Sequence, residues 1–232
     1  MTKENDFRKE QLKYPRVRAA YQHNKEGLKE LLAKRNISNF RIDLFIRAFK
    51  KEELLEVWVK QKGDDKYLHL MDFPFCESSG ALGPKRKEGD FQIPEGFYHI
   101  DRFNPSSNFH LSLGLNYPNK SDRIKGDKAN PGSNIFIHGG CATIGCIPIT
   151  DEKIKSLYIL AVEAKTNGQT NIPVHIFPSH LDKISYDKLK ANNGRHDPFW
   201  KNLKAGYDYF AREHIVPQIG VNHAGDYIIS ND

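Results

Sequence analysis

The stretch Ile135-Phe136-Ile137-His138-Gly139-Gly140-Cys141-Ala142-Thr143-Ile144-Gly145-Cys146 is the most informative part of this chain. A histidine at the end of an apolar, strand-like run is followed, across a short glycine-rich loop, by a Gly-Cys pair. A thiol is a useful nucleophile only as the thiolate, so it requires a base within hydrogen-bond reach and a backbone that presents the sulfur. His138 and Cys146 can meet these requirements, which predicts cysteine-based acyl transfer.

Cys146 is the predicted nucleophile. Gly145 allows the backbone to turn sharply in front of it, and a helix predicted from residue 151 would bring its positive N-terminal end near the thiolate. The amides of Gly145 and Cys146 are the expected oxyanion hole, and the Thr143 hydroxyl is expected to orient the loop. The alternatives are a buried structural cysteine and a threonine that only stabilises a turn.

His138 is the predicted general base, or the imidazolium of an ion pair with the thiolate. Because the motif contains no acid, we expect a backbone carbonyl to fix the tautomer of the ring. The alternative is a core histidine at the end of a strand.

Two further cysteines, Cys76 and Cys141, accompany the nucleophile. Zinc bound by His138, Cys141 and Cys146 is disfavoured because no second pair of ligands matches them. A disulfide between Cys141 and Cys146 would remove the nucleophile. We therefore expect Cys141 to be a buried spectator and Cys76 to lie in the core.

The order His138-Gly139 followed by Thr143-x-Gly145-Cys146 resembles the signature of the L,D-transpeptidase catalytic domain (YkuD) family, most closely its YafK-like branch. Residues 83–86 and 94–100 resemble the Gly-Lys-Pro and Pro-x-Gly-x-Phe segments that precede the active site in that family. The resemblance covers roughly residues 41–178. Two positions depart from the family pattern: Pro148 replaces the usual arginine, and Ile144 stands where many members carry a second histidine.

The resemblance implies a cell-wall enzyme without a cofactor or metal that acts on peptidoglycan stem peptides. Cys146 would attack the carbonyl of an L,D-peptide bond, and an amine or water would take the acyl group. An amidase that cleaves a diaminopimelate-linked bond and a non-catalytic wall-binding module remain alternatives. The resembling segments and the loop 116–133 supply the candidate substrate-binding residues Tyr98, Arg86, Asn116, Tyr117 and Arg123.

The composition limits the partners of the protein. With 232 residues, 38% hydrophobic and 28% charged, the chain can bury a proper core, and no apolar run approaches the ~20 residues that span a membrane. A net charge of +6 suits an anionic partner, but no nucleic-acid motif accompanies it, so nucleic acid is not expected. A monomer is expected.

The N-terminus lacks a secretory signal, which taken literally predicts a cytoplasmic protein. The resemblance instead implies the periplasm or cell envelope, with the signal absent from this chain, and we favour this second interpretation.

The hydrophobic periodicity predicts an α+β fold. Strands are expected at 40–49, 55–59, 67–71, 97–101, 109–115 and 174–177, the first three antiparallel. Helices are expected within 6–35, from 151 to 166 with Thr150 as N-cap, and around 199–210. Residues 215–229 are expected to be irregular. We divide the chain into an N-terminal helical appendage (1–39), an L,D-transpeptidase-like β-sandwich domain (40–178) and a helical C-terminal extension (179–232).

Overall fold

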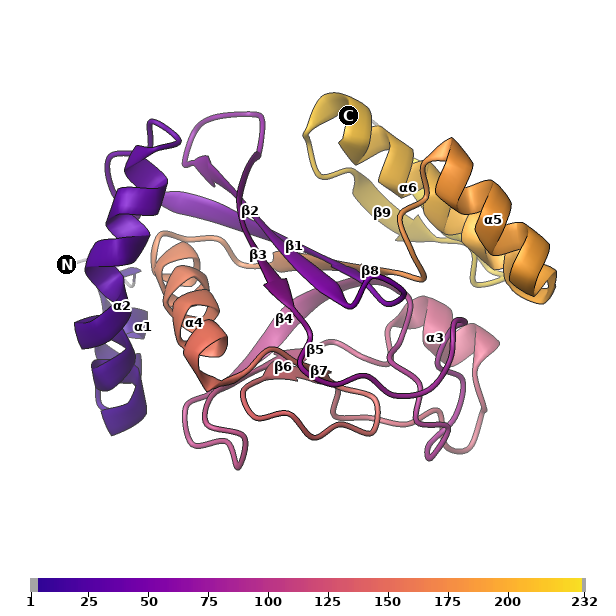
Figure 1. Cartoon of the computed structure of the whole chain (residues 1–232), viewed down its shortest axis with the longest axis horizontal. Coiled ribbons are helices and arrows are strands. Elements are labelled where there is room, and N and C mark those ends of the chain that lie inside the picture. Colours follow the sequence, from indigo (N-terminus) through magenta and orange to yellow (C-terminus); the bar gives the residue numbers. More distant parts are fainter. Residues whose placement is uncertain (1–3, 231–232) are drawn as a thin grey trace.

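The computed structural model describes residues 4–230, in which α-helices cover both faces of a curled eight-stranded sheet (Figure 1). The strand order is β3-β2-β1-β8-β4-β5-β6-β7. The strands of this sheet are β1 (Ile42–Phe49), β2 (Leu54–Gln61), β3 (Leu68–Pro74), β4 (Gly96–Asn104), β5 (Ser112–Leu115), β6 (Phe136–His138), β7 (Ile147–Pro148) and β8 (Ile172–Phe177). The predicted α+β class is confirmed.

Strands β1, β2 and β3 form an antiparallel meander, as predicted. The alternating apolar residues of this region face the core, and Ile46 pairs with Val57 across the ladder. Strand β8 then inserts between β1 and β4, parallel to the first and antiparallel to the second. This long-range insertion joins the N-terminal meander to the strands that carry the His-Cys motif.

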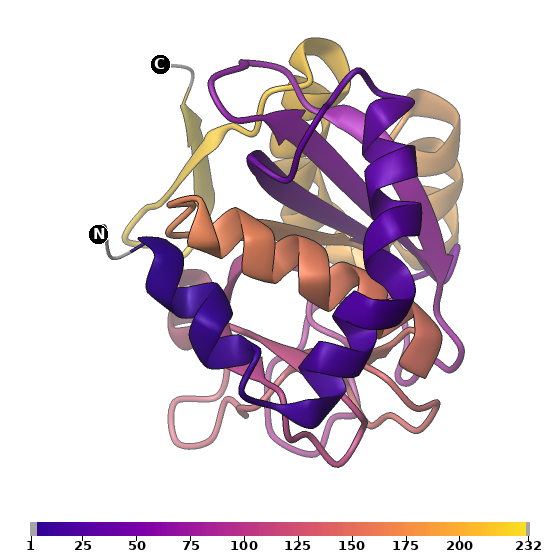
Figure 2. The ribbon, with the colours of Figure 1, turned by 90° about the vertical axis from the view of Figure 1, so that its left-hand side faces the viewer.

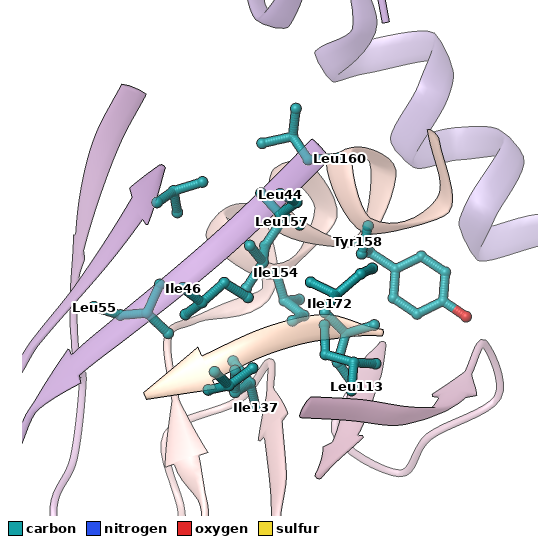
Figure 3. Close-up of a cluster of buried hydrophobic side chains, with 14 of the residues drawn as sticks. Leu44, Ile46, Leu55, Leu113, Ile137, Ile154, Leu157, Tyr158, Leu160 and Ile172 are labelled. Atoms are coloured by element: carbon teal, nitrogen blue, oxygen red, sulfur yellow. The ribbon is translucent and has the colours of Figure 1, made fainter. Parts of the chain in front are cut away.

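Helix α4 (Asp151–Thr166) has the bounds predicted from the sequence and lies across one face of the sheet. Figure 3 shows Ile154 and Leu157 directed toward strand residues such as Ile46 and Ile137. The helix is buried on nearly all sides because α1 (Glu4–Gln11) and α2 (Pro15–Ala33) cover its outer surface (Figure 2). The predicted N-terminal helix is therefore two helices, with Pro15 starting the second.

The C-terminal elements pack on the opposite face of the sheet through an aromatic-rich cluster that contains Phe97, Phe177 and Trp200 (Figure 1). These elements are α5 (Lys183–Asn193), the 3-10 helix η1 (Gly194–His196), α6 (Asp197–Glu213), β9 (Gln218–Val221) and β10 (Tyr227–Ser230). Helix α6 was predicted, but the hairpin of β9 and β10 was not. Its apolar residues are few and are separated by the glycines that led us to expect irregular structure.

Three local expectations near the motif were wrong. Strand β5 begins at Ser112 rather than at residue 109, because His110 has a φ of 68° that interrupts extended backbone. The loop expected at 116–133 contains helix α3 (Lys120–Lys125), which starts at a capping box between Asn119 and Asp122. Thr150 precedes α4 but makes no side-chain cap, since its backbone has a φ of 71°.

Within residues 4–230, no helix combines the length and apolarity that crossing a membrane requires.

Candidate active site

Strands β6 and β7 bring His138 and Cys146 to one end of the sheet. The two strands run parallel, with Ile137 beside Ile147 and His138 beside Pro148. Because side chains alternate along a strand, His138 and Cys146 fall on the same face of this strand pair. Both line a pocket of about 270 Å³, here called the His138 pocket. Its remaining lining residues are Asn104, Ser107, Asn108, Phe109, Ser112, Asn134 and Phe136.

The His138 ring is 2% exposed and is held on two sides. Its Nδ1 lies against the carbonyl oxygen of Gly139, which can only accept, so Nδ1 carries the proton. The Phe109 ring lies over it with 4.5 Å between centroids. A backbone carbonyl therefore fixes the tautomer, as expected, and Nε2 of the neutral ring is left as the basic nitrogen.

Cys146 is half-buried and is the free cysteine of the described chain. Its Sγ lies 3.7 Å from the Asn134 carbonyl oxygen. Burial raises the pKa of the Cys146 thiol above its ordinary value, and the Phe136 N–H and the positive charge of Lys85 oppose that rise. Burial likewise lowers the pKa of His138, although the Gly139 carbonyl opposes the change.

These opposite pKa shifts bear on the two protonation states considered from the sequence. A raised thiol pKa and a lowered imidazole pKa favour the neutral forms of Cys146 and His138. The resting arrangement therefore suits general-base catalysis better than a preformed ion pair.

Thr143 organises the backbone in front of the sulfur. Its Oγ1 accepts from the amides of Gly145 (3.2 Å) and Cys146 (2.8 Å) and donates to the Cys146 carbonyl (2.9 Å). Gly145 has a φ of 131°, and a Cβ there would lie 3.0 Å from the Gln92 carbonyl oxygen, so this position requires glycine. The two amides expected to form the oxyanion hole are occupied by the Thr143 hydroxyl, which corrects that expectation for this conformation.

Cys141 and Cys76 are joined in a disulfide, with 5.4 Å between their Cα atoms. The expectation of a spectator Cys141 and a core Cys76 was wrong, because the loop after β3 runs alongside the His-Cys loop in the folded chain. The amide of Cys76 donates to the Pro148 carbonyl at 3.0 Å, which brings the two segments together. The disulfide also occupies one sulfur of the zinc site considered from the sequence, and residues 4–230 hold no cluster of three potential metal ligands.

A second pocket, of about 200 Å³, meets the first at Cys146 and Asn134. We call it the Lys85 pocket. It is also lined by Glu88, Gly89, Phe91, Ser133, Ile135 and Ile144. Phe91 and Ile144 are 54% and 74% exposed, so an apolar rim borders the sulfur on this side. Cys146 thus lies between two concave sites.

The family model of the L,D-transpeptidase catalytic domain (YkuD) matches residues 43–176, a range that contains both pockets and all of the motif. The chain is also 34% identical over 189 residues to the protein YafK of Escherichia coli (strain K12). The aligned region covers 81% of this chain and 74% of YafK. The chain belongs to the L,D-transpeptidase catalytic domain family.

Solved structures with similarity to this L,D-transpeptidase-family chain are distant in sequence. The helical cell shape determining protein Pgp2 from Campylobacter jejuni has a TM-score of 0.47 and 18% identity, over 78% of this chain and 73% of Pgp2. L,D-transpeptidase 1 of Mycobacterium tuberculosis has a TM-score of 0.34 and 15% identity, over 58% of this chain and 62% of that protein.

The five substrate-binding candidates do not line either pocket that contains Cys146. Tyr98 is buried, and its hydroxyl donates to Asp122 at 3.1 Å. Arg86 lies 3.6 Å from the same carboxylate, whose pKa burial raises to about 6. The Tyr117 hydroxyl donates to the Pro131 carbonyl.

Asn116 accepts from the His99 amide and lines a separate cavity of about 550 Å³ with Tyr98, and Arg123 is exposed on α3. The contacts of these side chains lie in and around the segment from β4 to α3, away from the two pockets at Cys146. Proximity in sequence to a motif does not specify the direction of a side chain, so a substrate-binding role of these five residues stays a prediction.

Most residues that line the two pockets at Cys146 were not predicted from the sequence. Phe109, Asn134 and Phe91 come from three separate loops, and nothing in the sequence shows that these loops converge. Lys85 was not among the predicted site residues. In the structure its ammonium pairs with Asp90 at 2.6 Å, and its positive charge opposes the rise in the pKa of Cys146.

Proposed function

We propose that this chain is a cysteine acyl-transfer enzyme of the cell envelope, an L,D-transpeptidase acting on peptidoglycan stem peptides. The observation that carries the proposal is the single pocket that holds both the free thiol of Cys146 and a histidine whose Nδ1 is committed to a carbonyl. Membership of the L,D-transpeptidase family supplies the substrate class.

The reaction begins with a neutral thiol and a neutral imidazole. Nε2 of His138 accepts the thiol proton as Sγ of Cys146 attacks the carbonyl of an L,D-peptide bond. The imidazolium, stabilised by the Gly139 carbonyl on its other nitrogen, then protonates the departing amine. A thioester remains on Cys146 until an amine or water attacks it. His138 accepts a proton from this acceptor, and the Cys146 sulfur takes that proton as it leaves the acyl carbon, which restores the neutral thiol and imidazole.

The two pockets fit the two sides of this reaction. Because His138 must protonate the departing amine and later deprotonate the acceptor, both groups belong in the His138 pocket. The acyl portion then extends into the Lys85 pocket, past Phe91 and Ile144. Thr143 must rotate, or other donors must act, before the Gly145 and Cys146 amides can bind the oxyanion.

Mass spectrometry of peptidoglycan fragments incubated with the protein tests the proposal. Tetrapeptide-containing fragments should yield new cross-linked or amine-exchanged products, and Cys146→Ala should reduce product formation by about 10³-fold or more with an unchanged circular dichroism spectrum. Release of material bound through diaminopimelate without cross-linking would instead identify the amidase. Binding of the fragments without any Cys146-dependent product would identify a non-catalytic module.

A further inference from the structure

The peptide group between Gly139 and Gly140 has a partner at each end. Its carbonyl accepts from Nδ1–H of His138, and its N–H donates to Oδ1 of Asp151 at 2.8 Å. This one planar peptide therefore connects His138, the predicted base, to the carboxylate of Asp151. The connection runs from the end of β6 to the first residue of α4.

The fit between this peptide and Asp151 is close. A Cβ at position 139 would collide with Oδ1 of Asp151 and would lie 2.8 Å from the Phe109 carbonyl oxygen. Gly139 is therefore the residue that allows the carboxylate to approach this peptide. The amide of Gly139 in turn donates to the Leu111 carbonyl, which fixes the other side of the turn.

We propose that Asp151 is a positioning residue for His138 that acts through the Gly139–Gly140 peptide. In a Ser-His-Asp triad the carboxylate accepts directly from the Nδ1–H of the histidine, holding its orientation and stabilising the imidazolium. Here a peptide stands between the two groups. A negative charge at its N–H end increases the electron density on its carbonyl oxygen, because linked hydrogen bonds polarise one another.

The proposal rests on the proposed function, since a base requires orientation only if it acts on Cys146. The effect should be moderate because Asp151 is exposed and water screens its charge. The charge of Asp151 also acts on His110 of the β4–β5 loop, as do those of Arg16 of α2 and of Glu152 and Lys155 of α4. The variants that test the proposal leave His110, Arg16 and Lys155 unchanged.

Asp151→Asn and Glu152→Gln form a matched pair of variants. Both remove one negative charge from the first turn of α4, but Glu152 is paired with Lys155 and makes no contact with the Gly139–Gly140 peptide. A loss of helix stability from the missing charge affects both alike. Asp151→Ala additionally removes the acceptor of the Gly140 amide.

Two measurements are made on each variant: the pH dependence of Cys146 alkylation by iodoacetamide, and the titration of the His138 ring by NMR, assigned with His138→Gln. For Asp151→Asn we expect alkylation near pH 7 about three- to tenfold slower than in the wild type, since the acceptor of the Gly140 amide loses its negative charge and a charge-assisted hydrogen bond becomes a neutral one. His138 should titrate at lower pH than in Glu152→Gln, and Asp151→Ala should shift it in the same direction.

Equal His138 titration in Asp151→Asn and Glu152→Gln overturns the proposal, whatever the activity of either variant. Failure of the proposed function has a different signature: Cys146 alkylation in the wild type that does not depend on His138. The NMR titration reports on Asp151 in both cases, so the two failures are distinguishable.

Discussion

The two catalytic candidates are held in different ways. Cys146 takes its geometry from its own loop, through the hydroxyl of Thr143 three residues earlier and the left-handed backbone of Gly145. His138 is held by distant segments: the Phe109 ring, and the Asp151 carboxylate acting on the peptide that its Nδ1 contacts. The position of the predicted nucleophile therefore depends on hydrogen bonds within its own loop, whereas that of the predicted base depends on the assembled sheet.

This difference explains why the short motif identifies the nucleophile so readily. A Thr-x-Gly-Cys segment can form much of its turn in any fold that accommodates it, because its hydrogen bonds are internal. The histidine, by contrast, would be an ordinary strand residue without β5, the β4–β5 loop and α4. Variants that alter either His138 or the loop that holds Cys146, and leave the other unchanged, should show how much each contributes to activity.

Among variants that keep Cys146, the largest effect is expected for the predicted base, His138. His138→Gln removes the proton acceptor, so we expect kcat/KM to fall by about 10²- to 10⁴-fold, the usual range for a general base. In the wild type, kcat/KM should fall as the pH drops through the His138 pKa, because the imidazolium cannot accept a proton. Burial lowers the pKa of His138, so this fall should lie below pH 6.5, the ordinary value for histidine.

Profiles of kcat/KM against pH for the wild type and for His138→Gln check this prediction. The acid limb should disappear in the variant. A limb that persists there unchanged would assign it to another group and remove His138 as the base.

A smaller effect is expected on the nucleophile side. Thr143→Val keeps the shape of the side chain but leaves the amides of Gly145 and Cys146 without their acceptor, at a cost of about 1–3 kcal/mol if they stay buried. We expect about a tenfold lower kcat/KM, and recovery in Thr143→Ser, which restores the hydroxyl. Steady-state kinetics with thermal unfolding check both variants.

Thr143→Val also tests the oxyanion hole. If the freed amides bind the oxyanion better than they do when paired with the hydroxyl, kcat rises instead of falling. That outcome would contradict the structural role of Thr143 and restore the function predicted for those amides.

The smallest effect on activity is expected at the disulfide between Cys76 and Cys141. This bond links the segment after β3 to the loop between His138 and Cys146. Cys76→Ser with Cys141→Ser should increase the motion of residues 141–144, of which only Thr143 is not exposed, while leaving the bonds of Thr143 and Gly139 in place. We expect a two- to fivefold loss of activity and a stability loss of about 2–4 kcal/mol, typical of a native disulfide. Denaturant unfolding and kinetics measure the two effects, and an unchanged unfolding midpoint would show that the disulfide does not stabilise the fold.

The success of the sequence predictions varied with the range of the interactions involved. The bounds of α4 and the β1–β3 meander follow from periodicity, and both were predicted correctly. The β9–β10 hairpin and helix α3 were missed, although the capping box of Asn119 and Asp122 was a readable signal for the second. The disulfide of Cys76 and Cys141 could not be inferred, because 65 residues separate the two sulfurs and three cysteines allow several pairings.

By itself, the sequence determined the fold class, the family signature and the order of His138, Thr143, Gly145 and Cys146, since these depend on short-range spacing and residue type. The tertiary structure alone decided which side chains surround the sulfur, how the base is oriented and which cysteines pair. The physical reason is that these contacts join loops far apart in the chain, and their approach is set by the packing of the sheet between its two helical layers.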